Sequence, residues 1–170
     1  MKKLVFVFTT LVALSVSQMA TAQKTIVDAA VSNENFSTLV TALKAADLVE
    51  ALQGDGPFTV FAPTNDAFAK IDKETLGNLL KPENKETLSK ILTYHVVSGK
   101  LMASDVVAAL KKGKGKVEVE TLAGQKLTVM QKDGKIWLKD QAGNYSEITA
   151  TDVKGSNGVI HVIDTVVMPK

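Results

Sequence analysis

The last apolar stretch of the chain, residues 157–169, places the strongest constraint on the fold. Between Val159 and Met168 most side chains are β-branched, and these favour extended backbone because their χ1 rotation is already restricted. Alternation along a strand distributes the apolar residues over both faces, so the stretch predicts a strand buried on both sides, in the middle of a sheet. Asn157-Gly158 provides the turn before it, and Pro169 ends it. Because this central strand is synthesised last, the sheet cannot be completed before the whole chain exists.

Residues 1–22 have the features of a secretory signal peptide in the right order. Lys2 and Lys3 precede an apolar run over residues 4–14, and residues 20–22 provide a small-x-small cleavage site. The run is too short for a transmembrane span. We therefore expect residues 23–170 to form a single secreted domain without a transmembrane anchor, exported to the periplasm or to the cell surface and extracellular space.

Composition excludes several classes of partner. The full chain has a formal charge of +2, and removal of the two signal-peptide lysines leaves a domain without net charge. This balance gives no electrostatic case for nucleic-acid binding. All 20 basic residues are Lys, so the domain lacks the planar guanidinium that holds phosphate or carboxylate through two parallel hydrogen bonds. It has no Cys either, and therefore depends on its core instead of disulfides.

Apolar residues follow helical spacing in the first part of the chain and strand alternation in the second. Helices are predicted over residues 25–31, 36–52, 64–71, 72–80, 82–92 and 104–112. Strands are predicted over residues 57–63, 93–97, 117–120, 127–130, 136–138, 148–153 and 159–168. A two-residue hairpin is expected at Asp133-Gly134. This order favours an α+β fold with a mainly antiparallel sheet over a doubly wound parallel one.

Three sequence blocks resemble the signature blocks of the fasciclin-like domain family. They are residues 56–68 (Gly-Pro-Phe-Thr-Val-Phe-Ala-Pro-Thr-Asn-Asp-Ala-Phe), residues 92–97 (Leu-Thr-Tyr-His-Val-Val) and residues 157–164 (Asn-Gly-Val-Ile-His-Val-Ile-Asp). They occur in the family's order, and the similarity covers nearly all of residues 24–169. The chain thus resembles a secreted single-domain member, and its plain signal peptide fits a bacterial one. The resemblance implies a fasciclin-like β-wedge or sandwich of mainly antiparallel strands, with short helices packed along it and the two signature strands adjacent in the core.

The resemblance also implies an exported, non-enzymatic binding module that acts in cell-surface or matrix adhesion. Its partner would be a surface or matrix protein, or a glycan, and it needs no cofactor. In animal members, an Asp followed by a branched aliphatic residue just before the last block is implicated in integrin binding. The matching pair here is Asp152-Val153, which we take as the candidate partner-binding residues. We expect Asp152→Ala to weaken partner binding and to leave the thermal midpoint nearly unchanged.

The two histidines of the chain, His95 and His161, lie in the second and third blocks. With Asp66 and Asp164 they suggest a metal site, but a metal ion needs three or four converging ligands, and no His-x-x-x-His spacing is present. We expect buried imidazoles that hydrogen-bond to backbone or side-chain groups, and a helix cap in the first block. The residues assigned to this structural motif, with no catalytic or metal-binding role, are Thr64, Asn65, Asp66, Tyr94, His95, His161 and Asp164.

Three alternatives stay open. The apolar excess of the composition, a mean hydropathy of +0.10 with few aromatic residues, also fits a carrier of an envelope lipid or another small apolar ligand. A hydrolase is the weakest alternative, because the sequence contains no Gly-x-Ser-x-Gly elbow, no Ser-x-x-Lys pair and no Cys nucleophile. The basic run at residues 111–116 is interpreted first as a solvated loop, and second as a contact for an anionic polymer such as a cell-surface glycan.

Overall fold

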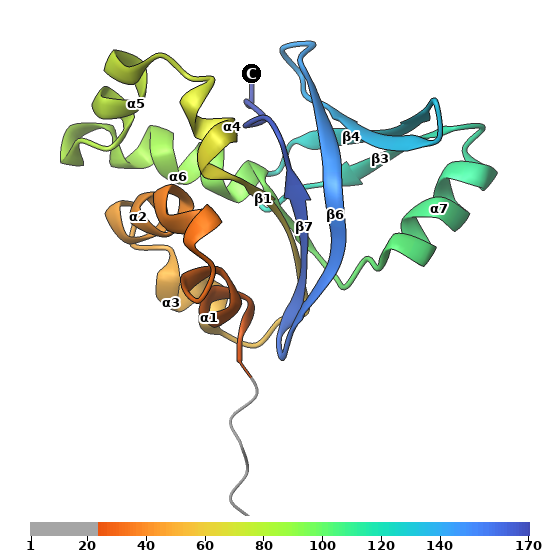
Figure 1. The fold of residues 1–170 in the computed structure, drawn as a ribbon, viewed down its shortest axis with the longest axis horizontal. Coiled ribbons are helices and arrows are strands. Elements are labelled where there is room, and N and C mark those ends of the chain that lie inside the picture. The colour runs from red at the N-terminus through yellow and green to blue at the C-terminus, as the bar shows by residue number, and fades with distance from the viewer. Residues whose placement is uncertain (1–23) are drawn as a thin grey trace, which may run out of the picture.

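The computed structural model describes residues 24–170, so the predicted signal peptide lies outside the described residues. The helices are α1 (Ile26–Val31), α2 (Ser37–Ala45), α3 (Val49–Gln53), α4 (Asn65–Ala69), α5 (Lys73–Leu79), α6 (Lys85–Tyr94) and α7 (Ala103–Lys112), with 3-10 turns at Glu34–Phe36 and Pro82–Asn84. The strands are β1 (Phe58–Pro63), β2 (Val96–Ser98), β3 (Lys116–Glu120), β4 (Lys126–Lys132), β5 (Lys135–Lys139), β6 (Tyr145–Gly155) and β7 (Gly158–Ile163). The predicted α+β class is confirmed (Figure 1).

All seven strands form one sheet in the order β2-β1-β7-β6-β5-β4-β3. β1 and β7 run parallel, from the pair Phe58–Gly158 to the pair Pro63–Ile163, and every other pairing is antiparallel. The last strand therefore lies inside the sheet, as predicted. The two ends of the sheet also meet, because Val97 forms an isolated bridge with Thr121. The sheet is consequently a nearly closed barrel.

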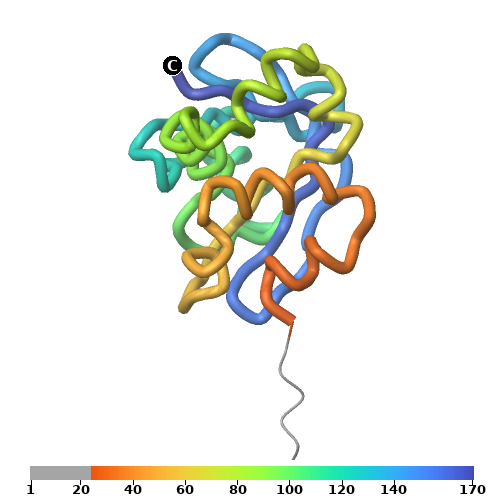
Figure 2. Tube along the Cα trace, turned by 90° about the vertical axis from the view of Figure 1, so that its left-hand side faces the viewer, coloured from red at the N-terminus to blue at the C-terminus, as the bar shows by residue number. Residues whose placement is uncertain are grey.

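The central strands separate two hydrophobic cores. Val60 and Ile160 pack into a core shared with helices α1, α2, α3, α4 and α6, whereas Phe61 and Ile163 point into a second core between the strands and α7. Figures 1 and 2 show α1 to α6 covering one side of the sheet, with α7 on the other. Residues that alternate along β1 and β7 are thus buried on both faces, which confirms the expectation for the last strand.

The structure corrects several predicted boundaries. β7 ends at Ile163 and not at Met168, because the chain bends at Asp164, whose carboxylate accepts from the backbone N–H of Glu147. Tyr94 ends α6 and does not start a strand; β2 begins only at Val96. The predicted helix 36–52 is interrupted near Asp47, whose φ of 54° is incompatible with a continuous α-helix. Short apolar runs fit a helix or a strand equally well, so their ends are set by contacts distant in the sequence.

The predicted turn at Asp133-Gly134 is confirmed. Lys132 pairs with Lys135, and φ is positive at both turn residues, 54° and 77°, as a type I′ hairpin turn requires. The basic run is more ordered than a loop: Lys112 ends α7 and Lys116 starts β3. A loop is therefore confined to the three residues between them.

Gly158 pairs with Phe58 where the β1–β7 ladder begins, and a Cβ there would overlap the carbonyl group of Phe58. We expect Gly158→Ala to lower the free energy of unfolding by about 2 kcal/mol, because the backbone of a paired strand cannot give way cheaply. Gly77, in α5, is the control: a Cβ there meets nothing within 4 Å, so Gly77→Ala should raise stability by about 0.5–1 kcal/mol. Urea unfolding measures both, and a wild-type midpoint for Gly158→Ala would contradict this packing.

Candidate partner-binding site around Asp152

Three neighbouring strands hold the segment that leads into α7, each through one side chain. From β1, the Thr59 hydroxyl donates to the carbonyl oxygen of Gly99 at 2.7 Å and accepts from the N–H of Leu101 at 2.9 Å. From β7, His161 contacts the carbonyl oxygen of Leu101 at 2.7 Å. From β6, an Asp152 carboxylate oxygen accepts from the N–H of Ala103 at 2.8 Å. The backbone of residues 99–103 is therefore fixed by groups that come together only in the folded sheet.

His161 is buried, and both of its ring nitrogens have backbone partners. Because the Leu101 carbonyl can only accept, Nε2 must carry the proton and donate to it. Nδ1 is then the acceptor that faces the N–H of Asp152 at 3.4 Å. The ring also packs against Phe61, with the ring centroids 5.8 Å apart. His161 thus connects β7 to the candidate pair on β6 and to the start of α7.

Asp152 occupies a bulge of β6. Ala150 pairs with Val162 and Val153 pairs with Ile160, so three steps along β6 face two along β7. Asp152 itself has a φ of 60°, in the left-handed region that few residues other than Gly, Asn and Asp occupy. The bulge keeps Asp152 half-buried against α7 and leaves the Val153 side chain 38% exposed. The two residues of the predicted pair therefore differ: Asp152 is held by internal contacts, and Val153 faces solvent.

His95 is buried at the end of α6 and ties the C-terminal tail to the core. Its Nδ1 donates to the carbonyl oxygen of Ile91 at 2.8 Å, and its Nε2 accepts from the N–H of Val167 at 3.1 Å. Burial lowers the pKa of His95 from its ordinary 6.5 to about 4, because the charged imidazolium would lose its hydration. Asp140 continues this anchoring, since its carboxylate accepts from the N–H of Met168 at 3.0 Å.

The other residues of the predicted structural motif also bond within the fold. The Tyr94 hydroxyl donates to the carbonyl oxygen of Lys126 at 3.0 Å. Asp164 accepts from the N–H of Glu147 at 2.8 Å and pairs with Lys70 at 3.1 Å. Partial burial raises the pKa of Asp164, but these hydrogen bonds and the Lys70 ammonium outweigh it and hold that pKa below its usual range.

The first block caps two helices. Thr64 accepts from the N–H of Ala67 and caps α4, as its position in the sequence predicted. Asn65 accepts from the N–H of Thr38 at 3.0 Å, at the start of the distant helix α2. Asp66 is exposed in the first turn of α4, where its charge favours the helix dipole. Within residues 24–170, no three His, Asp or Glu side chains gather as a metal site requires.

Besides Asp140, two further residues with comparable roles were missing from the predicted set. One is Thr59, whose only sequence signal is a polar side chain inside an apolar strand. The other is Asn157, predicted only as part of a turn. Its carboxamide accepts from the N–H of Ile26 at 3.0 Å and donates to the carbonyl oxygens of Leu52 and Gly54 at 2.8 and 2.9 Å. This one side chain joins the β6–β7 turn to the start of α1 and to the end of α3.

A family model described as "Fasciclin domain" matches residues 34–169. The chain belongs to the Fasciclin domain family. Among its relatives, Protein sll1483 of Synechocystis sp. is 55% identical over 155 residues, which cover 91% of this chain and 79% of that protein. The transforming growth factor-beta-induced protein ig-h3 of Sus scrofa is 34% identical over 145 residues, which cover 85% of this chain and 19% of ig-h3. This chain therefore corresponds to only a small part of that relative.

A solved structure supports the assignment of the fold. It is described as a FAS1 domain pair from the insect cell adhesion molecule fasciclin I, and it matches with a TM-score of 0.74 at 20% identity. The match covers 84% of this chain and 50% of the insect chain. The wedge of strands and helices expected from the signature blocks is thus the fold of this fasciclin domain.

The bonding of Asp152 changes what its substitution should do. Asp152→Ala removes the acceptor for Ala103 and places an alanine at a positive φ, so we expect a loss of about 1–2 kcal/mol in the free energy of unfolding, and not an unchanged thermal midpoint. Asp152→Asn keeps an acceptor oxygen and tolerates this φ, and should lose less than half as much. Thermal and urea unfolding of both variants measure this, and equal losses would contradict the described role of the carboxylate.

The low pKa of His95 predicts acid sensitivity between pH 6.5 and about 4. In this window the unfolded chain binds a proton that the native protein excludes, so stability falls as pH falls, by roughly 3 kcal/mol in total at 1.36 kcal/mol per unit of pKa difference. His95→Gln cannot take up that proton, and its stability should depend less on pH over the same window. His161 is present in both proteins, so the difference in slope reports His95, and identical slopes would contradict its burial as a neutral ring.

Proposed function

We propose that this fasciclin domain is an exported, non-enzymatic adhesion module that contacts a surface or matrix protein through Val153 and the surface around it. One observation carries the proposal: the bulge at Asp152 presents an exposed apolar side chain from a backbone that is held by the pairing of Val153 with Ile160 and by the contacts of Asp152 with Ala103 and His161. Contact residues are most effective when they are held in the bound conformation before binding, because less conformational entropy is then lost. Asp152 acts in this proposal as the residue that positions Val153.

Family membership supports the same function. The insect relative of known structure is named a cell adhesion molecule, and adhesion needs an accessible, preformed surface without turnover. Residues 1–22 fit export, which brings such a surface to the outside of the cell. None of the helices between residues 24 and 170 has the length and the apolar character that a membrane span requires.

The carrier alternative gains less support. The apolar pocket between the α1–α3 helices and the sheet is lined by residues such as Val27, Leu43 and Ile160, and has a volume of about 20 Å³. This volume accommodates about one water molecule. An acyl chain that entered this pocket would therefore have to displace packed core side chains, at a cost that adhesion through the surface does not incur.

Adhesion can be tested with beads that carry residues 23–170. We expect these beads to attach to cells of the organism that makes the chain more often than beads with heat-denatured protein. Val153→Lys should reduce the affinity of each contact five- to tenfold, as loss of an apolar anchor of about 1 kcal/mol predicts. Leu122→Lys is the matched control, because Leu122 is 44% exposed between β3 and β4, two strands that do not pair with β6.

The possible results separate the parts of this proposal. Attachment that survives Val153→Lys contradicts the assignment of the surface around Val153. Equal attachment of native and denatured beads contradicts adhesion as the function. If both lysine substitutions reduce attachment equally, the reduction is a general effect of the added charge. This result also contradicts the Val153 site.

A further inference from the structure

The outer face of the β4–β5–β6 ribbon carries the one Trp of the sequence. Met130 and Glu147 pair with Trp137 from the two neighbouring strands, so the indole lies in the middle of the ribbon. Tyr145, which is 50% exposed, starts β6 on the same face. Trp137, Tyr145, Met130 and Lys132 line one hollow. An aromatic surface of this kind is a common contact for ligands and partners.

The indole N–H of Trp137 has no acceptor. Its Nε1 is shielded from solvent, and no oxygen of residues 24–170 lies within hydrogen-bond reach. Trp N–H groups usually have a partner when buried, because an unpaired donor costs free energy. Two of the side chains that line the same hollow, Met130 and Lys132, are long and unbranched, so they can move aside for a ligand that supplies an oxygen.

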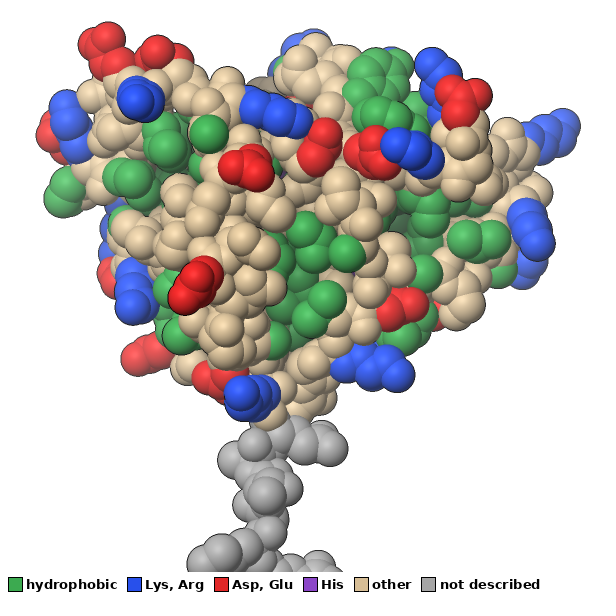
Figure 3. Space-filling model, in the orientation of Figure 1, with side chains coloured by type: hydrophobic (Ala, Val, Ile, Leu, Met, Phe, Trp, Pro, Cys, Tyr) green, Lys and Arg blue, Asp and Glu red, His purple; other side chains and the backbone are tan. Residues whose placement is uncertain are grey.

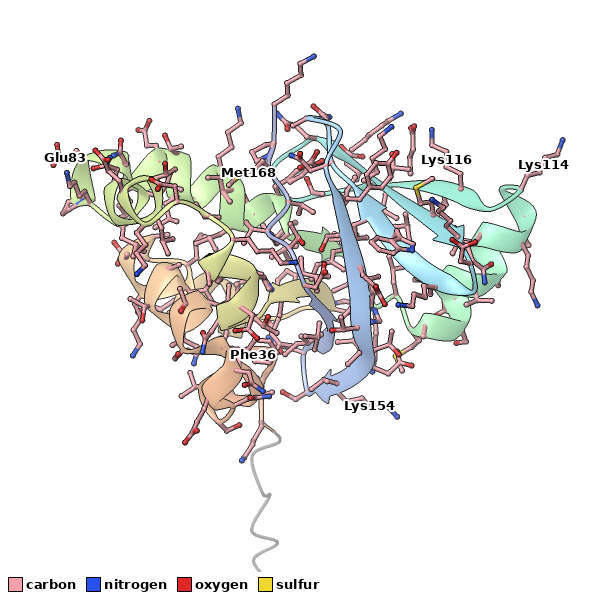
Figure 4. The ribbon with its side chains drawn as sticks, turned by 45° about the horizontal axis from the view of Figure 1, so that its top comes forward. Phe36, Glu83, Lys114, Lys116, Lys154 and Met168 are labelled. Carbon is pink, nitrogen blue, oxygen red and sulfur yellow. The ribbon has the colours of Figure 1, made fainter. Side chains whose placement is uncertain are left out.

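Lysines surround this hollow. Lys132 lines it, and Lys139 lies over the Tyr145 ring with its ammonium 5.4 Å from the centroid. Lys116, the end of the basic run, pairs with Met130 from the neighbouring strand β3. Figure 4 shows Lys116 and Lys114 projecting into solvent from this part of the molecule. The space-filling view shows hydrophobic side chains at the upper right with charged side chains beside them (Figure 3).

Two of the nearby acids are paired with other lysines, and Glu120 lies at the opposite end of β3 from Lys116. Glu147 is bonded to Lys135 at 2.8 Å, and Glu118 to Lys126 at 3.2 Å. None of the four ion pairs of residues 24–170 engages Lys116 or Lys132. These two ammonium groups flank Met130 on the aromatic face and are available to an anion.

We propose that the face centred on Trp137, defined by Lys116, Met130, Lys132, Trp137 and Tyr145, binds an anionic polysaccharide. A pyranose ring offers an apolar C–H face to the aromatic rings, and its oxygens can accept from the unpaired indole N–H. Carboxylate groups along the chain would pair with Lys116 and Lys132. An acidic peptide also supplies carboxylates, but it has no flat C–H face in a fixed position beside them. The aromatic rings therefore favour the sugar.

This surface is separate from the adhesion surface proposed above. Tyr145 starts β6, and Trp137 of β5 pairs with Glu147 near that start, whereas Val153 lies near the other end of β6, next to Lys154 (Figure 4). The glycan site therefore does not depend on Val153, and either proposal can fail without the other.

Because Trp137 is the only Trp, its fluorescence reports binding directly. We expect a polygalacturonate oligomer to change the emission in a saturable way, and neutral dextran to leave it unchanged. Lys116→Glu/Lys132→Glu should raise the Kd at least tenfold, and Tyr145→Ala should raise it at least fivefold. Lys73→Glu/Lys81→Glu is the matched control with the same change of charge on the helical side, and should alter the Kd less than twofold.

Trp137→Phe keeps an aromatic ring and loses the N–H, so calorimetry should show weaker binding of the same oligomer. Emission that does not respond to polygalacturonate overturns the proposal. Equal weakening by both double variants also overturns it, because binding would then follow overall charge. If poly-L-glutamate of matched length binds as tightly, an acidic protein segment replaces the glycan as the assigned partner.

Discussion

The parallel pairing of β1 with β7 is the interaction on which the rest of the structure depends. It joins segments about one hundred residues apart, and the paired strands are buried on both faces. The helical layer packs on one face, and the barrel-like ribbon with α7 encloses the other. Loop closure over such a distance has an entropic cost that only extensive burial can offset. Gly158 belongs to this pairing because a larger residue would keep the two backbones apart.

The polar residues of the signature blocks stabilise the fold more than they contribute to its exposed surface. Thr59, His95 and His161 are buried, and each hydrogen-bonds to the backbone of another segment. A buried polar group left unpaired costs more than its bond contributes, so such groups select one arrangement of segments over others. Recognition is then left to exposed side chains such as Val153 and Tyr145, two of the few large apolar residues that face solvent.

Features encoded within a few residues were predictable from the sequence. The β-branched last strand, the Asp133-Gly134 hairpin and the Thr64 cap depend on local preferences, and the structure has all three. The bond from Asp152 to Ala103 joins residues 49 positions apart and leaves no periodic signal. The unpaired indole of Trp137 is equally hidden, since burial of one atom depends on which side chains gather around it. Family resemblance located the pair at Asp152-Val153, and only the fold distinguished the held residue from the exposed one.

The meeting of the two sheet ends has a consequence for how copies of this domain can associate. The N–H of Leu122 donates to Val96 at 2.8 Å, so the short strand β2 is partly covered by the chain that follows β3. Lys116, Glu118 and Glu120 place charge along β3, which discourages the addition of a foreign strand. Main-chain augmentation of the sheet is therefore disfavoured. Crowded copies on a surface would touch through side chains alone, and would remain separable instead of growing into a continuous fibre.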